Sequence, residues 1–312
     1  MKNPFIYSDD NKRYHTFNYY LRHKYGQKVY KVPLDAHFSC PNRDGTCGYG
    51  GCIFCSSQGS GEFAASNIND IIEQFEENKK MMEAKWPNSL AIPYFQAFSN
   101  TYGPLSKIKA CIEPFINYPK VCAIAIATRP DCLDDEKIAY LASLTTHFDV
   151  YIELGLQSSN DDTAQFINRG HDFACLQNCV EKLNQTPLKT VVHIINGLPN
   201  ETSTDMLKTI KDVNDLKVFG IKIHMLHISQ HTVIANMYKQ APWPMLSMME
   251  YVDIVIKQLE LLDQNIVIER LTGDPVKDEL IAPSWVLNKT QVLNEIDKKM
   301  ALLDTYQGKA LE

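Results

Sequence analysis

The chain has 312 residues, of which 45% are hydrophobic and 22% charged, and its formal net charge at pH 7 is −6. This length and apolar content allow one large α/β domain with a full core, and no apolar run reaches the roughly 18 residues that a transmembrane helix needs. The acidic balance does not indicate nucleic acid, and the stretch MKNPFIYSDDNKRYH lacks the apolar core of a signal peptide, so we expect a cytoplasmic protein without a membrane partner.

The N-terminal segment, residues 1–30, is expected to form a basic and aromatic extension. Residues 12–43 carry seven Lys and Arg residues against the single acidic residue Asp35. A surface of this kind can bind phosphates and stack on bases. The composition alone nevertheless favours a more ordinary interpretation, in which an N-terminal helix buries a stripe of aromatic side chains.

From residue 31 onward, apolar β-rich runs alternate with amphipathic helical stretches. The predicted strands span 32–38, 90–98, 121–128, 149–157, 190–197 and 219–227, and helical periodicity covers 67–84, 105–116, 134–144, 173–184 and 203–215. Strands separated by helices of this length form βαβ units with a parallel sheet. Six successive units, with no GxGxxG after the first strand, favour a partial (β/α)6 TIM-like barrel over a dinucleotide-binding sheet. This core would cover 31–244, and a last helix, the short strand NIVIER and a terminal helix would form a C-terminal cap over 245–312.

Polar residues occupy alternate positions on three consecutive predicted strands. Each of these sets shares one strand face: Glu153, Gly155 and Gln157; His193, Ile195 and Gly197; Lys222 and His224. Strands buried on both faces are normally continuous in Val, Ile and Leu, and buried polar groups need partners. Hydrogen bonds within the barrel would account for some of these residues, but their recurrence favours a ligand-lined interior.

The stretch CPNRDGTCGYGGCIFC, residues 40–55, holds four of the nine cysteines, which indicates metal or redox chemistry rather than a disulfide framework. The spacing Cys47-x4-Cys52-x2-Cys55 matches the first part of a plant-type [2Fe–2S] pattern. All four cysteines together would suit structural zinc. The spacing Cys40-x11-Cys52-x2-Cys55 would place three thiolates on a [4Fe–4S] cluster and leave one iron without a protein ligand. The position of this loop, directly after the first strand at the barrel mouth, favours the third assignment, because an open iron has to meet a substrate.

Several segments, taken in order, are typical of one superfamily. They are YYLRHKYGQKVYKVPLDAHFSCPNRDGTCGYGGCIFCSSQGSG, YFQAFSNTYGP, ATRPDCL, ELGLQSSNDDTAQFINRGHD, GLPNET, GIKIHMLHI and RLTGDPVKDELIAP. The chain resembles the radical S-adenosylmethionine (SAM) superfamily, and within it the YhcC/YtqA-type family related to the radical domain of the Elongator catalytic subunit. The resemblance implies that Cys40, Cys52 and Cys55 bind a [4Fe–4S] cluster. Cys47 stands where the family usually has another residue, so we interpret it as a bystander.

The resemblance also implies a set of SAM-binding residues, each of which could instead make a core hydrogen bond. Phe54 would lie near the adenine, and Gln96 occupies the place of the glycine-rich motif that receives the methionyl amino group. Arg169 resembles the arginine that pairs with the SAM carboxylate. The remaining residues expected to bind the cofactor are Thr128, Gln157 and His193. Four residues are left for catalysis on the substrate, namely Glu153, Lys222, His224 and His227, and Arg270 with Asp274 would close the site.

The resemblance implies an enzyme that reductively cleaves SAM to a 5′-deoxyadenosyl radical, with a flavodoxin or ferredoxin as reductant. Its relation to Elongator and the basic N-terminal segment lead us to expect a tRNA substrate, modified on the C5 side chain of a wobble uridine. We expect no acetyltransferase domain, so a reaction such as carboxymethylaminomethyl to aminomethyl would need only hydrogen abstraction. The alternatives are a radical SAM enzyme acting on a small metabolite or peptide, and a non-catalytic iron–sulfur or zinc protein.

Overall fold

The computed structural model describes the whole chain except residues 1–4, 60, 62–63, 65–67 and 69. Its strands are β1 (Val29–Leu34), β2 (Leu90–Phe95), β3 (Ala123–Thr128), β4 (Asp149–Gln157), β5 (Lys189–Asn196), β6 (Gly220–Met225), β7 (Ile228–Ser229), β8 (Val267–Arg270) and β9 (Leu280–Ala282). Its α-helices are α1 (Phe17–Tyr25), α2 (Ile71–Lys85), α3 (Leu105–Ile112), α4 (Asp135–Ser143), α5 (Asp161–Phe166), α6 (Phe173–Leu183), α7 (Ser203–Asp215), α8 (Val233–Gln240), α9 (Met248–Leu261) and α10 (Lys289–Leu302). Within this part of the chain, no helix is both long and apolar enough to cross a membrane.

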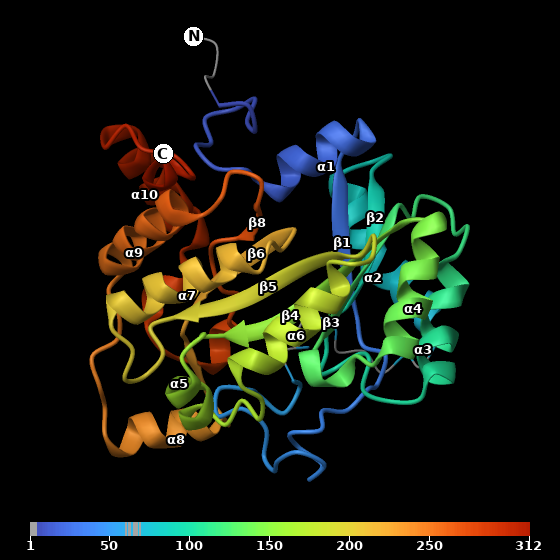
Figure 1. Cartoon of the computed structure of the whole chain (residues 1–312), viewed down its shortest axis with the longest axis horizontal. Helices are drawn as coiled ribbons and strands as arrows, with labels where there is room; N and C mark the ends of the chain where they lie inside the picture. The colour runs from blue at the N-terminus through green and yellow to red at the C-terminus, as the bar shows by residue number, and fades with distance from the viewer. Residues whose placement is uncertain (1–4, 60, 62–63, 65–67, 69) are drawn as a thin grey trace.

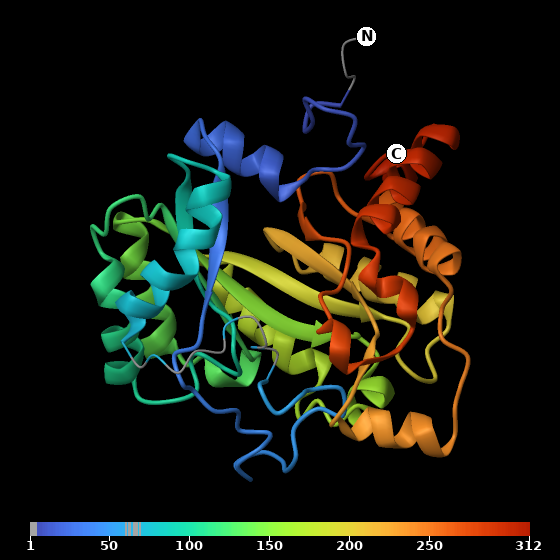
Figure 2. The ribbon, with the colours of Figure 1, turned by 180° about the vertical axis from the view of Figure 1, so that it is seen from behind.

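Seven parallel strands form one curled sheet in the order β1-β2-β3-β4-β5-β6-β8, with helices on its outer side (Figures 1 and 2). This arrangement confirms the expected partial TIM-like barrel. The sheet contains one strand more than the six βα units predicted, because β8, from the short strand NIVIER, pairs in parallel with β6. A separate antiparallel pair, β7 with β9, lies beyond the sheet.

The element boundaries follow local sequence signals. The predicted strand 149–157 is reproduced in full by β4, whereas β1 covers 29–34 instead of 32–38 because the backbone turns at His37, whose φ is +52°. Helix α3 ends before Pro114, which cannot continue an α-helix. The predicted helix 67–84 begins at residue 71, after the N-cap Asp70, and positions 67 and 69 lie outside the described residues.

Helix α1 packs against the end of the barrel opposite the loop that carries the four clustered cysteines (Figure 1). Leu21 is 3% exposed, and Phe17 and Tyr20 pack with it around the barrel residue Tyr151. Lys24 forms an ion pair with Asp149 at the start of β4. These contacts favour the ordinary interpretation of the N-terminal segment, since its partly buried aromatic side chains pack over the end of the barrel opposite the cysteine loop.

Candidate active site in the barrel

One cavity of about 870 Å³ occupies the barrel interior, and its lining extends from the cysteine loop to the N-terminal segment. All of the predicted site residues line it: Cys40, Cys52, Phe54, Cys55, Gln96, Thr128, Glu153, Gln157, Arg169, His193, Lys222, His224 and His227. Arg270 and Asp274 also line the cavity, and their side chains approach to 3.2 Å. The strand-face pattern thus predicted which side chains share the interior.

The cysteine loop is held in shape by its own backbone. The Cys55 amide donates to the Cys52 carbonyl at 3.0 Å, and the Gly51 amide donates to the Asn42 carbonyl at 2.8 Å. Gly51 has a φ of +79°, a conformation that side chains with a Cβ rarely adopt. The Ile53 amide donates to the Ile167 carbonyl at 3.0 Å, which fastens the loop to the end of α5.

The thiols of Cys52 and Cys55 form a hydrogen bond with each other, and this bond shifts their pKa values in opposite directions. A hydrogen bond from Cys55, together with Arg169 and Arg129, lowers the pKa of Cys52 to about 5 against the opposing effect of burial. The same hydrogen bond and burial raise the pKa of Cys55 well above its usual value. At neutral pH the pair therefore holds one thiolate, and thiolate is the form that binds iron.

The donor set fits an iron–sulfur cluster. Three thiols from one loop, Cys40, Cys52 and Cys55, face the same cavity, and buried cations lie beside them. The described residues contain no group of three Cys, His, Asp or Glu side chains arranged to hold a single metal ion. The fit to an iron–sulfur cluster therefore rests on the chemistry of the three donors, since cysteine thiolates are the usual ligands of such clusters.

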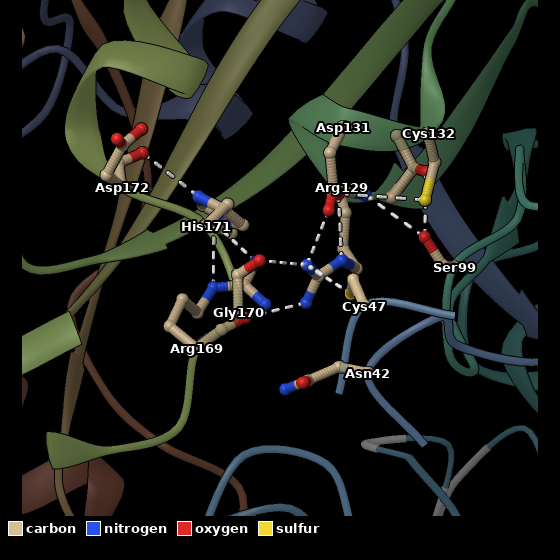
Figure 3. A network of polar contacts seen from close by, with 12 residues as sticks. Asn42, Cys47, Ser99, Arg129, Asp131, Cys132, Arg169, Gly170, His171 and Asp172 are labelled. Carbon is tan, nitrogen blue, oxygen red and sulfur yellow. Dashed lines mark hydrogen bonds and ion pairs between the residues drawn. The ribbon is translucent and has the colours of Figure 1, made fainter. Parts of the chain in front are cut away.

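Cys47 differs from the other three cysteines in its position relative to the cavity. Its side chain is exposed, and it is not among the described residues that line the cavity. The guanidinium of Arg129 contacts its sulfur, with Nη2 at 3.5 Å (Figure 3). Partial burial raises the pKa of the Cys47 thiol, although Arg129 acts in the opposite direction.

A layer of polar and charged side chains crosses the interior of the barrel. Glu153 is fully buried and accepts hydrogen bonds from Lys31 and Lys222, each at 2.5 Å, and it also pairs with His193 at 2.8 Å. Lys31 reaches in addition to Glu269 on β8, at 2.5 Å. We call these five residues the lumen layer.

The charges of the lumen layer are balanced within it. Burial opposes ionisation of Glu153, but Lys222, Lys31 and His193 outweigh burial and hold the pKa of this carboxyl well below its usual value. Burial, together with repulsion from the lysines, lowers the pKa of His193 to about 4, so the imidazole is neutral at pH 7. Burial also lowers the pKa of Lys222 to about 8, although Glu153 acts in the opposite direction.

Two of the predicted residues depart from the expected arrangement. The Thr128 hydroxyl interacts with the hydroxyls of Ser99 at 3.1 Å and Thr101 at 2.6 Å, which favours a core role. Gln157 has a φ of +74° at a bulge between β4 and β5, so its side chain leaves the regular strand pattern.

Four residues of the site were missed from sequence. Lys31 was included in the basic surface segment, and Tyr94, Arg129 and Glu269 were not singled out. Tyr94 lines the cavity and accepts a hydrogen bond from Lys222 at 3.2 Å. Lys31 and Tyr94 could have been found from the same alternation of strand faces that identified Glu153.

The comparisons with known proteins agree with this geometry. The family model described as the radical SAM superfamily matches residues 45–213, and the model described as the radical SAM C-terminal domain matches residues 218–301. The uncharacterized protein YtqA of Bacillus subtilis is 45% identical over 307 residues, which cover 98% of this chain and 95% of YtqA. Protein YhcC of Escherichia coli is 31% identical over 279 residues, which cover 89% of each chain.

Two further similarities are more distant. The tRNA uridine(34) acetyltransferase of Methanocaldococcus jannaschii is 24% identical over 155 residues, which cover 49% of this chain and 28% of that protein. The solved structure of the archaeal Elp3 from Methanocaldococcus infernus superposes with a TM-score of 0.65 at 16% identity, covering 88% of this chain and 63% of that one. At this level of identity the superposition establishes the fold.

Proposed function

The chain belongs to the radical SAM superfamily and, within it, to the family of YtqA and YhcC, and on that premise we propose that it modifies the C5 side chain of a tRNA wobble uridine. The example we favour is the shortening of a carboxymethylaminomethyl group to aminomethyl. Abstraction of a hydrogen from the methylene between nitrogen and carboxylate, return of one electron to the cluster and hydrolysis of the resulting imine would break the C–N bond and release the two carbons as glyoxylate. One observation carries the proposal: the three thiols and the polar faces of β4, β5 and β6 line a single cavity.

Cys40, Cys52 and Cys55 would hold the [4Fe–4S] cluster and leave one iron open to SAM. When bound, the cluster and SAM supply a 5′-deoxyadenosyl radical, with electrons from a flavodoxin or ferredoxin. The chain itself would bind and orient SAM and the substrate, and would exclude water from the cavity. Phe54, Gln96, Gln157 and His193 line the same cavity as the cysteines and are proposed to bind SAM, with His193 at the boundary to the substrate.

The lumen layer, together with His224 and His227, forms the part of the cavity that is proposed to bind the substrate. His224 is neutral, because burial, with Arg270 the largest of the neighbouring charges, lowers its pKa well below the usual value. A neutral imidazole can accept a proton from the substrate or donate a hydrogen bond to it. Glu153 and Lys222 are bound to one another, so we propose that they position His193 and the substrate rather than exchange protons at every turnover.

The distant tRNA uridine(34) acetyltransferase supports a wobble uridine as the target, since the name of that protein specifies this nucleoside. The route of entry differs from our expectation for the N-terminal segment. Helix α1 lies at the end of the barrel opposite the cysteine loop, where Lys24 forms an ion pair with Asp149. We therefore propose that the anticodon approaches from the cysteine loop, with the uridine inserted into the cavity.

Mass spectrometry of nucleosides from bulk tRNA tests the proposal directly. Cells that lack the protein should lose one C5-modified uridine and accumulate its precursor, and expression of the wild-type chain should restore the product. An unchanged nucleoside profile under several growth conditions would contradict a tRNA substrate and would direct the search to a small metabolite or peptide.

The proposed ligand set has its own test in the purified, cluster-loaded protein. Release of 5′-deoxyadenosine from SAM should require a reductant and should be abolished by Cys40→Ala. The matched control is Cys47→Ala, which should retain the release because the Cys47 side chain is exposed and lies outside the cavity lining. The reverse result would show that our assignment of the cysteines is wrong.

A further inference from the structure

Arg169 lies in the connection between α5 and α6, and its side chain points at a sulfur. The residue is 6% exposed, and its Nη1 donates to Cys52 Sγ at 3.7 Å. Its Nε and Nη2 both donate to the Gly155 carbonyl, at 3.2 and 2.5 Å. The fork of the guanidinium is therefore held by β4 on one side and directed at the cysteine loop on the other.

Within the described part of the chain, the charge of Arg169 has no carboxylate partner. Among the residues that the structure describes, no Asp or Glu oxygen lies within 4.0 Å of its guanidinium nitrogens. A buried cation without an anionic partner is costly, so such groups are normally paired. The group within reach of Nη1 is the Cys52 sulfur, and hence any cluster that Cys52 binds.

Arg129 provides a contrast at the same rim of the barrel. It is 3% exposed and forms a two-point pair with Asp131, with Nε–Oδ1 at 2.9 Å and Nη2–Oδ2 at 2.6 Å (Figure 3). Its Nη1 donates to the backbone carbonyl of Arg169 at 2.7 Å, and its Nη2 donates to that of Gly170 at 3.2 Å. Arg129 with Asp131 is thus a neutral unit that fixes the backbone from which Arg169 extends.

We propose that Arg169 is a positioning residue for the iron–sulfur cluster, which it holds through Cys52 and whose reduction potential it raises. The inference rests on the cluster ligands proposed above. Reduction adds one negative charge to a site that already carries thiolates. A nearby buried cation and an N–H···S hydrogen bond stabilise that charge, and both are known determinants of cluster potentials.

This role differs from the one that the family resemblance implies, in which the arginine pairs with the SAM carboxylate. The contacts with Cys52 and Gly155 involve Nε, Nη1 and Nη2 of Arg169. An electrostatic effect on the cluster would be present before SAM binds, whereas a carboxylate contact would be seen only with SAM. The two roles can therefore be separated by experiment.

The experiment is a redox titration of the cluster-loaded protein without SAM, followed by electron paramagnetic resonance. We expect Arg169→Gln to shift the reduction potential to a more negative value, and Arg169→Lys, which keeps the charge, to shift it less. The matched control is the double variant Arg129→Gln/Asp131→Asn, which removes a neutral pair and should shift the potential less than Arg169→Gln. Iron and sulfide content are measured first for each variant.

A second variant leaves Arg169 in place and moves its fork. In Gly155→Ala, the new Cβ would lie 2.7 Å from Arg169 Nη2, so the guanidinium has to shift from its position. We expect a smaller negative shift of the potential than in Arg169→Gln. If Arg169→Gln fails to retain iron while remaining folded by circular dichroism, the holding role is supported, and Gly155→Ala then tests the effect on the potential.

The opposite outcome is equally specific. Unchanged potentials in Arg169→Gln and Gly155→Ala, with a loss of SAM affinity in Arg169→Gln by equilibrium dialysis, would overturn the proposal in favour of carboxylate binding. Failure of the wild-type chain to bind a cluster, or its retention in Cys40→Ala, would instead contradict the proposed ligand set. The two failures are thus distinguishable.

Discussion

At the scale of single residues, Glu201 is a buried carboxyl group whose protonation should affect the stability of the fold. This residue precedes the N-cap of α7, and its carboxylate accepts a hydrogen bond from Ser158, which directly follows β4. Burial raises the pKa of Glu201 to about 6, although the hydrogen bonds from Ser158 and Thr163 act in the opposite direction. Glu201 therefore connects the loops after β4 and β5, and the free energy required to bury its carboxylate increases as the group ionises.

Between pH 4.5 and about 6, the folded chain retains a proton on Glu201 that the unfolded chain has released. The free energy of unfolding should therefore decrease as pH rises through this range, by about 2 kcal/mol from this residue. Urea denaturation of the wild type and of Glu201→Gln at pH 4.5 and pH 7 measures the effect. The stability of the wild type, relative to the variant, should fall between the two pH values, and parallel pH profiles would contradict the shifted pKa.

The residues that sequence predicted well are those whose signal is local. Cys52 and Cys55 are three positions apart, and the polar positions of β4 alternate within one strand. The Lys31–Glu269 pair has no such signal, because 238 residues separate its members and only the closing of the barrel brings them together. Arg129 was missed because its role depends on backbone carbonyls of another loop.

At the scale of secondary-structure elements, α1 is the part for which the sequence left two interpretations open. A basic and aromatic composition is compatible with either a nucleic-acid surface or a buried helix face. Composition does not specify which side of a helix faces the core, and here the end of the barrel determines it. The helix begins at the N-cap Thr16 and ends at Gly26, whose φ of +70° is accessible to glycine.

Helix α1 should accordingly contribute to stability through its inward face. We expect Leu21→Ala to lower the free energy of unfolding by about 2–5 kcal/mol, because Leu21 is 3% exposed and its loss leaves a cavity. The matched control is Arg22→Ala, at an exposed neighbouring position, which should change stability by no more than about 0.5 kcal/mol. Equal effects of the two substitutions in urea denaturation would show that α1 is not docked as described.

At the scale of the whole molecule, the sheet is open between its edge strands, β1 and β8. The N-terminal segment bridges this opening at the end of the barrel opposite the cysteine loop. Thr16 pairs in parallel with Ile268, and the Ile268 amide donates to the His15 carbonyl at 2.7 Å. Deeper in the interior, Lys31 of β1 bridges to Glu269 of β8 and to Glu153 of β4. The lumen layer thus joins the two edges of the sheet through charge rather than through a strand pair.

This bridge predicts a large and non-additive effect on stability. Replacing Lys31 with Met would leave Glu153 and Glu269, whose side chains are 0% and 1% exposed, with Lys222 as their remaining lysine partner. Removing one partner of a buried ion pair typically costs about 3–5 kcal/mol, whereas an exposed pair contributes about 1 kcal/mol or less. The control is Lys182→Met, since Lys182 and its partner Asp135 are 53% and 83% exposed.

A double-mutant cycle with Glu269→Gln separates the bridge from the loss of a lysine. Neutralising Glu269 removes one of the two carboxylates that Lys31 compensates, so the double variant Lys31→Met/Glu269→Gln should be less destabilised than the sum of the single variants. The free energies of unfolding come from urea denaturation of the four proteins at pH 7. Additive effects would mean that Lys31 and Glu269 do not interact, and the barrel would then be closed at this level by the N-terminal segment alone.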